Sequence, residues 1–134
     1  MSEQNVELVR RCLDAFNERD LDGYIATVAD DLVIHSQFAG VEARTYHGHE
    51  DVPRYFQDLA EAWHRYRAEP VDLVEGKDGR VACQLVTRAE AERSGIEVTK
   101  RIGAVFSVRG GKVVAIDVYP NRADALEAAG LHGR

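Results

Sequence analysis

Residues 98–119 read VTKRIGAVFSVRGGKVVAIDVY and predict two β-strands joined by the turn Gly110-Gly111. Runs rich in β-branched and aromatic residues on either side of a two-residue glycine turn are a strong short-range signal for a hairpin. A turn of this length fixes the register, so Arg109 is predicted to pair with Lys112 and every later pair follows from that one.

This register divides the hairpin into two faces, both largely apolar. One face is predicted to carry Arg101, Gly103, Val105, Ser107, Val114, Ile116 and Val118. The other is predicted to carry Ile102, Ala104, Phe106, Val108, Val113, Ala115, Asp117 and Tyr119. A sheet with one wet face would alternate apolar and polar residues more cleanly. We therefore expect helices of the same chain on one face and, on the outer face, a second copy in a homodimer.

The remaining elements follow from apolar spacing and turn residues. Helical spacing predicts helices over residues 3–18, shortly after Asp20, and over 50–66, with a final helix over 122–129. Strands are predicted at 32–36, 69–75, 80–92, 97–109 and 112–119, with a loop over 37–48. This order predicts an α+β fold in which helices cover one face of a bent antiparallel sheet.

Length and composition narrow the class of protein. The 134 residues predict one domain spanning 1–134, and the formal net charge of −6 argues against a nucleic-acid partner. No apolar run approaches ~18 residues, and the start lacks the basic and apolar regions of a signal peptide, so we expect a cytoplasmic protein without a membrane partner. Cys12 and Cys83 have no metal-ligand or redox spacing and are expected to be reduced core thiols.

Several phrases of the chain resemble one protein superfamily. They are AFNERDLDG at 15–23, ADD at 29–31, YHGHE at 46–50, GKVV at 111–114 and ALEAAG at 125–130. Together with the order of elements, they resemble the nuclear transport factor 2 superfamily, and within it the SnoaL-like and ketosteroid-isomerase-like proteins. The resemblance implies a cone-shaped curved antiparallel sheet packed on three N-terminal helices, and dimers through the outer sheet face. It does not imply one activity, because this scaffold hosts isomerases, cyclases, epoxide hydrolases, dehydratases and non-enzymatic binders.

The family's best-known reactive groups are absent or altered here. By resemblance, the oxyanion-hole tyrosine of the ketosteroid isomerases falls on Cys12, and their second oxyanion acid falls on Gly103. Their general base falls on Ser36, or on His35 if the strand slips by one residue. The acid that SnoaL-type cyclases carry on the last strand falls on Val118. The chain therefore resembles the scaffold and departs from both of these active sites.

The same resemblance places the Gly103 face inward, toward a cavity. If Ser94-Gly95 is a two-residue turn, Gln84 and Arg88 share this inner face, and Arg88 is directly opposite Arg101. Two like charges in that position destabilise a sheet unless they lie at its rim. There they would bind a carboxylate or phosphate of a ligand. Alternatively, both arginines extend into water and pair with Glu90 or Glu92.

His35 is the candidate catalytic residue, because its ordinary pKa near ~6.5 suits a general base. The alternatives are a histidine bonded to backbone or facing outward, with Ser36 inward. His47 and His49 are expected in the loop that enters the third helix rather than at a metal. Tyr55 and Trp63 lie at helical core spacing, where they are expected to pack and to wall the cavity.

Two function classes follow. The first is a protein that binds a small organic molecule in an apolar pocket between the third helix and the sheet. The alternative is a lyase, isomerase or hydrolase acting on a small hydrophobic substrate, with His35 as base and Gln84, Arg88 or Arg101 polarising an oxygen. No cofactor and no metal is expected with either. The position of His35 relative to the pocket discriminates between the two classes.

Overall fold

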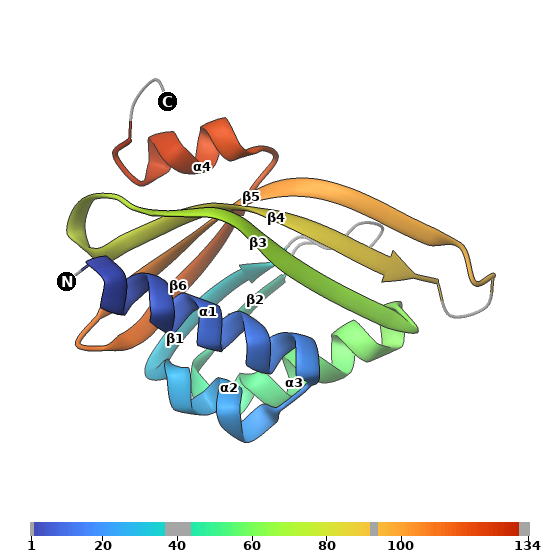
Figure 1. Ribbon diagram of the computed structural model, residues 1–134. Coiled ribbons are helices and arrows are strands. Elements are labelled where there is room, and N and C mark those ends of the chain that lie inside the picture. The colour runs from blue at the N-terminus through green and yellow to red at the C-terminus, as the bar shows by residue number, and fades with distance from the viewer. Residues whose placement is uncertain (1, 37–43, 92–93, 132–134) are drawn as a thin grey trace.

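The computed structural model describes residues 2–36, 44–91 and 94–131, which form one curved sheet with helices on both of its faces (Figure 1). The helices are α1 (Ser2–Glu18), α2 (Leu21–Thr27), α3 (Gly48–Ala62) and α4 (Arg122–Ala128), with a short 3₁₀ turn η1 (Lys77–Gly79). The strands are β1 (Val28–Ser36), β2 (Arg44–His47), β3 (Arg65–Glu75), β4 (Arg80–Glu90), β5 (Glu97–Arg109) and β6 (Lys112–Tyr119). The α+β architecture predicted from the sequence is confirmed, as a cone with α1, α2 and α3 on its inner side.

The strands follow the order β2-β1-β6-β5-β4-β3. All neighbouring pairs are antiparallel except β1 and β6, which run parallel. The sheet is therefore mixed rather than wholly antiparallel. Although β1 and β6 are neighbours in the sheet, the chain between them contains β2, α3, β3, β4 and β5. No tight hairpin therefore joins them, and they can run parallel.

Two apolar clusters lie on opposite faces of this sheet. The larger cluster fills the space between the sheet and α1, α2 and α3, and its largest buried side chains include Phe106, Tyr24 and Tyr46. The smaller cluster lies under α4 and contains Ala82, Val105, Ala125, Leu126 and Ala129. Each large apolar side chain fully removed from water stabilises the fold by roughly 1.5–3 kcal/mol, so both faces contribute.

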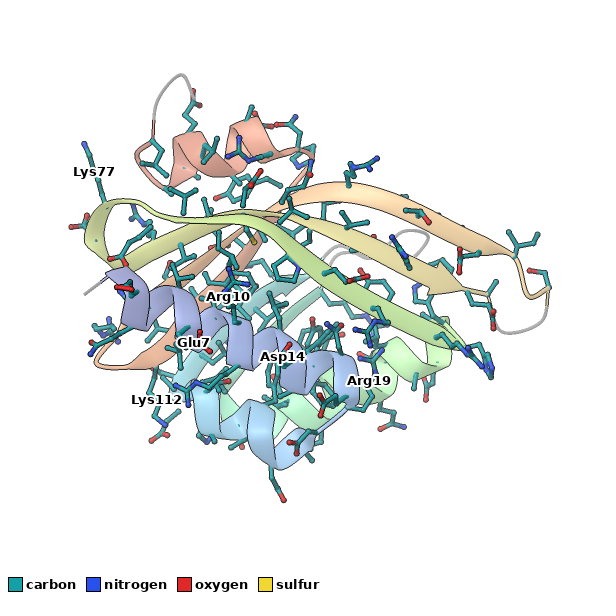
Figure 2. All side chains as sticks on the ribbon, in the orientation of Figure 1. Glu7, Arg10, Asp14, Arg19, Lys77 and Lys112 are labelled. Atoms are coloured by element: carbon teal, nitrogen blue, oxygen red, sulfur yellow. The ribbon has the colours of Figure 1, made fainter. Side chains whose placement is uncertain are left out.

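The N-terminal helices form where the sequence predicts them. On α1 the buried side chains Val9, Leu13 and Phe16 recur at helical spacing, whereas Glu7, Arg10 and Asp14 project from its outward side (Figure 2). The helix α2 starts directly after Asp20, as predicted, and the Asp20 side chain caps it by accepting a hydrogen bond from the Gly23 N–H at 3.0 Å. A similar cap starts α4, where Asn121 accepts from the Asp124 N–H at 2.8 Å.

The third helix ends earlier than predicted. It stops at Ala62 instead of residue 66, and Trp63 is already extended. The His64 N–H donates to the Glu90 carbonyl at 2.8 Å. This bond to β4 holds the chain after Ala62 in an extended conformation, and β3 begins at Arg65. The predicted loop 37–48 also contains β2, which is a strand of four residues and too short for a periodic signal; the part of that loop at residues 37–43 lies outside the described residues.

A β-bulge changes which residues of β6 face inward. The two pairs next to the turn, Arg109 with Lys112 and Val108 with Val113, are as predicted, but Ser107 then pairs with Ala115. One extra residue in β6 shifts every later pair, so Phe106 pairs with Ile116. The predicted faces of Ala115, Ile116, Asp117, Val118 and Tyr119 are therefore wrong, and Ala115 lies with Ser107 on the Gly103 face. Ile116 and Val118 lie on the Phe106 face, and Asp117 and Tyr119 lie on the Gly103 face.

The predicted inward orientation of the Gly103 face is also wrong. A Cβ atom at Gly103 would lie 2.1 Å from the Asn121 carbonyl oxygen and 2.9 Å from the Ala125 Cβ, so this residue is pressed against α4. The chain itself therefore covers part of the outer face around Val105. Pairing of two copies through the remainder of this face stays a prediction. Within the described residues, no helix is long and apolar enough to cross a membrane.

Candidate apolar ligand pocket

A pocket opens between the inner face of the sheet and the helices α1, α2 and α3. Its cavity volume is about 50 Å³, counted as the space open to the centre of a water molecule. One water needs ~10–15 Å³ by the same measure. The lining residues come from both layers: Cys12, Leu13, Phe16, Tyr24, Ile34, Tyr55, Tyr66, Ala68, Leu85, Ile102, Phe106, Ile116 and Val118. The lining is apolar apart from one thiol and three phenol hydroxyls, and it carries no formally charged side chain.

These four polar groups are held in their protonated forms. Burial raises the pKa of the Cys12 thiol to about 11 and that of the Tyr66 phenol to about 12. Burial also raises the pKa of Tyr24 and of Tyr55 well above the ordinary value for a phenol. At neutral pH the pocket therefore offers neutral hydrogen-bonding groups and no anion that could act as a base.

Aromatic rings build one wall of the pocket. The Phe16 ring lies 5.8 Å from the Tyr55 ring and meets the Tyr66 ring edge-on at 6.0 Å between centroids. Tyr24 and Tyr55 are 6.4 Å apart. Such tilted and edge-to-face contacts are favourable arrangements for aromatic side chains, so these rings hold one another in place.

Arg19 fixes the end of this wall. Its guanidinium lies 4.9 Å above the Phe16 ring and donates hydrogen bonds to the Phe16 carbonyl and, at 2.7 Å, to the Tyr66 carbonyl. These bonds join the end of α1 to the start of β3. The cation is thus engaged with backbone oxygens and does not line the pocket.

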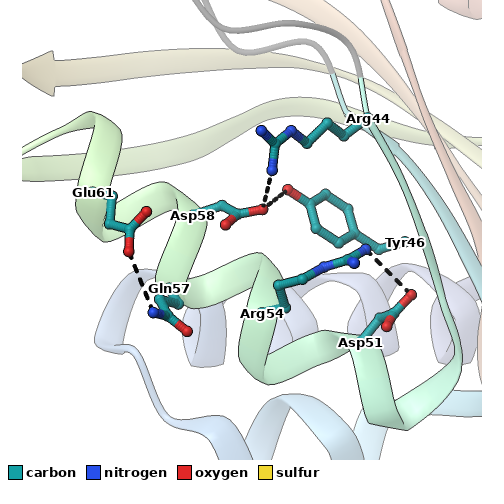
Figure 3. Close-up of polar contacts among 7 residues, drawn as sticks. All are labelled: Arg44, Tyr46, Asp51, Arg54, Gln57, Asp58 and Glu61. Atoms are coloured by element: carbon teal, nitrogen blue, oxygen red, sulfur yellow. Dashed lines mark hydrogen bonds and ion pairs between the residues drawn. The ribbon is translucent and has the colours of Figure 1, made fainter.

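A polar network holds α3 against β2 (Figure 3). Asp58 accepts hydrogen bonds from the Tyr46 hydroxyl at 2.7 Å and from Arg44 at 3.0 Å. Burial and the Asp58 carboxylate raise the pKa of Tyr46 to about 12. The Tyr46 ring lies 5.0 Å from the ring of Tyr55, so this network positions one of the lining phenols.

The predicted base His35 lies outside the pocket. It is on β1 with Asp117 as its partner on β6 and Thr45 as its partner on β2. Its Nε2 is 3.8 Å from the Asp117 carboxylate and its Nδ1 is 3.4 Å from the Thr45 hydroxyl. The side chain is 55% exposed and faces away from Ile34, which does line the pocket.

The predicted ligand-binding side chains Gln84, Arg88 and Arg101 are on the outer face too. The β4–β5 register is shifted by two residues from the predicted one, so Arg101 pairs with Val86, and Arg88 pairs with Thr99. The two arginines are therefore not directly opposite each other, because the turn that joins their strands is longer than two residues. The predicted pair at residues 88 and 101 is wrong in its register, and neither side chain lines the pocket.

Of the remaining predicted residues, Tyr55 lines the pocket and Trp63 does not. Tyr55 is 7% exposed on α3 and contacts the aromatic wall. Trp63 follows the last turn of α3 and packs against the larger apolar cluster, with its indole N–H buried and without a hydrogen-bond partner among the described residues. Packing, one of the two roles expected of Trp63, is thus its observed role.

His47 is the last residue of β2 and His49 lies in the first turn of α3, so the prediction that both lie in a loop is wrong. Both interact with backbone or carboxylate groups. His49 Nε2 lies 2.8 Å from the Val28 carbonyl and its Nδ1 lies 3.8 Å from Asp30, whereas the His47 N–H donates to Asp51 at 2.8 Å. Over residues 2–36, 44–91 and 94–131, no three histidine, cysteine or acidic side chains come together as metal ligands would.

Comparison with known proteins identifies the family of this pocket-bearing fold. The model of the SnoaL-like domain matches residues 9–116, which include every lining residue except Val118. The chain belongs to the SnoaL-like domain family. No curated protein matches it.

Solved structures similar to this SnoaL-like domain share its fold at low sequence identity. An NTF2-like protein of unknown function from Burkholderia pseudomallei is 23% identical, with a TM-score of 0.76 over 94% of this chain and 97% of the other. TerC, co-crystallised with polyporic acid, is 18% identical, with a TM-score of 0.77 over 94% and 97%. A protein with a ketosteroid isomerase-like fold from Catenulispora acidiphila, in complex with trimethylamine, is 14% identical, with a TM-score of 0.74 over 93% of each chain.

Sequence reasoning missed most of the pocket of this SnoaL-like domain. It did not assign Cys12, Phe16 and Tyr24 to ligand binding, and it placed Ile102 and Phe106 on the wrong side. A signal was present, since Ile102, Ala104, Phe106 and Val108 are apolar without interruption, whereas Arg101, Ser107 and Arg109 alternate with them. That alternation is typical of a strand whose even-numbered residues face the helices.

Proposed function

We propose that this SnoaL-like domain binds a small, uncharged, apolar organic molecule in the pocket and performs no reaction on it. The observation that carries this proposal is the lining itself: aliphatic and aromatic side chains surround a space larger than one water. An apolar cavity of that kind is favourable for an apolar ligand and unfavourable for water, since water needs two to four polar partners.

The position of the candidate base favours binding over catalysis. An enzyme using His35 requires that side chain within hydrogen-bond reach of the substrate. His35 instead lies beside Thr45 and Asp117 on the outer face. The groups that do reach the pocket are a thiol and phenols that stay protonated at neutral pH, so they donate hydrogen bonds and do not abstract protons.

The test uses methylenecyclohexane, a neutral hydrocarbon the size of one ring, titrated into ¹⁵N-labelled protein and followed by NMR. We expect saturable shifts at amides of the pocket-lining residues. The variant Ala68→Leu places a larger side chain into the pocket from β3, where Ala68 is 4% exposed, and should weaken binding at least tenfold.

The matched control is Ala60→Leu, the same substitution at an exposed position of α3. It should leave the affinity within twofold of the unaltered protein. Equal binding by Ala68→Leu and Ala60→Leu, or no saturable binding to the unaltered protein, would contradict the proposal.

A further inference from the structure

The strand β3 forms one edge of the sheet, because among the described strands it pairs with β4 alone. In an antiparallel pair, the backbone groups of successive residues point alternately toward the neighbouring strand and away from it. Alternate residues of β3 therefore direct an N–H and a C=O toward the open edge of the sheet. Such groups need partners from outside the sheet.

Two side chains at the end of α1 bind these edge groups. The Asn17 side chain donates to the Ala68 carbonyl at 2.9 Å and accepts from the Ala68 N–H, also at 2.9 Å. Arg19, which Figure 2 shows at the end of α1, donates to the Tyr66 carbonyl at 2.7 Å and to the Phe16 carbonyl. We call Asn17 and Arg19 the α1–β3 clamp.

The clamp joins two walls of the pocket. Phe16 on α1 and Tyr66 and Ala68 on β3 all line the pocket, and the clamp binds backbone groups of these same three residues. The next described bond between the two elements, from Asn5 to Glu75 at 3.3 Å, lies at the opposite end of the helix. The clamp therefore fixes the separation of α1 and β3 at the pocket itself.

The clamp acts against widening of the pocket. The rings of Phe16 and Tyr66 already meet edge to face, with 6.0 Å between their centroids, so the two walls cannot come closer at this point. Without the clamp, none of the described hydrogen bonds at this end of α1 holds the walls together. An edge strand that loses these bonds is free to move away from the helix.

We propose that the α1–β3 clamp sets the width of the pocket and thereby the size of the ring that the pocket admits. This inference rests on the proposed function, because it names the size specificity of the same pocket. Neither Asn17 nor Arg19 lines the pocket, so both are positioning residues. One methylene more or less in an apolar pocket changes discrimination by roughly 10–200-fold, so ring size is a sensitive measure of the width.

The experiment compares methylenecyclohexane with methylenecycloheptane, which has one more methylene in its ring. The measured quantity is the ratio of their affinities, determined by NMR titration for the unaltered protein and for two variants. Asn17→Ala removes both bonds to Ala68 and should shift the ratio toward the larger ring by about three- to tenfold, a part of the range for one methylene. Arg19→Met removes the guanidinium donors, keeps a long apolar stem and should shift the ratio in the same direction.

The matched control is Asn121→Ala, which also removes a side chain that binds backbone. Asn121 accepts from the Asp124 N–H at 2.8 Å, but it caps α4 on the opposite face of the sheet. Lower stability alone reduces both affinities together, so this variant should leave the ratio unchanged. In Asn17→Ala, faster hydrogen exchange at the Ala68 amide verifies that the clamp is open. Circular dichroism verifies folding, and if Asn17→Ala is not folded, Arg19→Met decides alone.

Two results would overturn the inference. One is an unchanged ratio in either folded clamp variant, and the other is a shift toward the smaller ring. If methylenecyclohexane still binds the unaltered protein in a saturable manner, the proposed function stands and only the role of the clamp fails. If methylenecyclohexane does not bind the unaltered protein, both fail together.

Discussion

The variant Gly103→Ala tests whether Gly103, on β5, faces the helix α4 or the pocket. A Cβ atom here would lie 2.1 Å from the Asn121 carbonyl oxygen, 2.8 Å from the Asn121 carbonyl carbon and 2.9 Å from the Ala125 Cβ. Two of these three atoms belong to the backbone, so no side-chain rotation relieves the overlap. The helix α4 must move, and its N-cap at Asn121 moves with it.

The expected cost is that of overpacking a well-filled contact, about 1–3 kcal/mol of unfolding free energy. For a chain of this length, that corresponds to a melting temperature lower by roughly 4–12 °C. Equilibrium urea unfolding at neutral pH measures the free energy directly. Ser107→Ala, on the same strand and the same face, is the control and should change stability by no more than about 0.5 kcal/mol.

The opposite orientation makes the opposite prediction. If Gly103 lined the cavity, alanine would fill empty space and would restrict the unfolded chain, so stability would rise by about 0.4–1 kcal/mol. A Gly103→Ala variant as stable as the unaltered protein, or more so, would therefore refute the packing of α4 against β5. It would also refute the assignment of Ile102 and Phe106 to the pocket. The affinity for methylenecyclohexane should stay unchanged, since α4 lies on the far face.

Three further predictions concern stability. Asn17→Ala should lower the free energy of unfolding in urea by about 1–3 kcal/mol. The Asn17 side chain bonds both the N–H and the carbonyl of Ala68 at 2.9 Å, and its removal leaves both groups unpaired. An unchanged free energy would exclude this role. In a double-mutant cycle, Tyr46→Phe and Asp58→Asn should couple by about 1 kcal/mol through their 2.7 Å bond, and additive effects would argue against it. Burial raises the pKa of Cys12 to about 11 and of Cys83 to about 12, from an ordinary 9.0. The folded state thus holds these protons more tightly, so stability should be level below pH 9 and fall above it, by roughly 2 kcal/mol per cysteine at pH 10.5. Cys83→Ala should remove only its own share of that fall, roughly 2 kcal/mol at pH 10.5, because the buried tyrosines with raised pKa values also contribute to it; an unchanged fall would contradict the burial of the Cys83 thiol.

The order of helices and strands was predictable because its signals are local. Apolar spacing, capping residues and glycine turns determine where α1, α2 and β4 to β6 form. The end of α3 was not predictable from those signals, since Trp63 and Tyr66 continue the helical spacing. It is set by a backbone bond from His64 to Glu90, which only the tertiary structure supplies.

The lining of the pocket was less predictable, because a strand reverses its faces with every single-residue shift. Residues 113–118 are apolar at nearly every position, so their pattern does not indicate where an extra residue is inserted. The turn at Gly110-Gly111 fixes only the first two pairs of the hairpin. The side chains beyond the bulge therefore had to be placed by the packing of Phe106 and Ile116 against the helices.

The bulge in β6 also determines whether this pocket contains an acid. With the uninterrupted register, Asp117 would share the face of Phe106 and would project among the aromatic rings. The extra residue instead turns Asp117 outward, and the parallel pairing of β1 with β6 places it directly beside His35. The acid and the base most suited to proton transfer thus meet each other on the outer face, 3.8 Å apart, and leave the pocket with neutral donors alone. Side chains along a strand alternate between the two faces of the sheet, so one inserted residue decides whether an acid lies inside the pocket or outside it. The same scaffold can thus carry a pocket with or without a group for proton transfer.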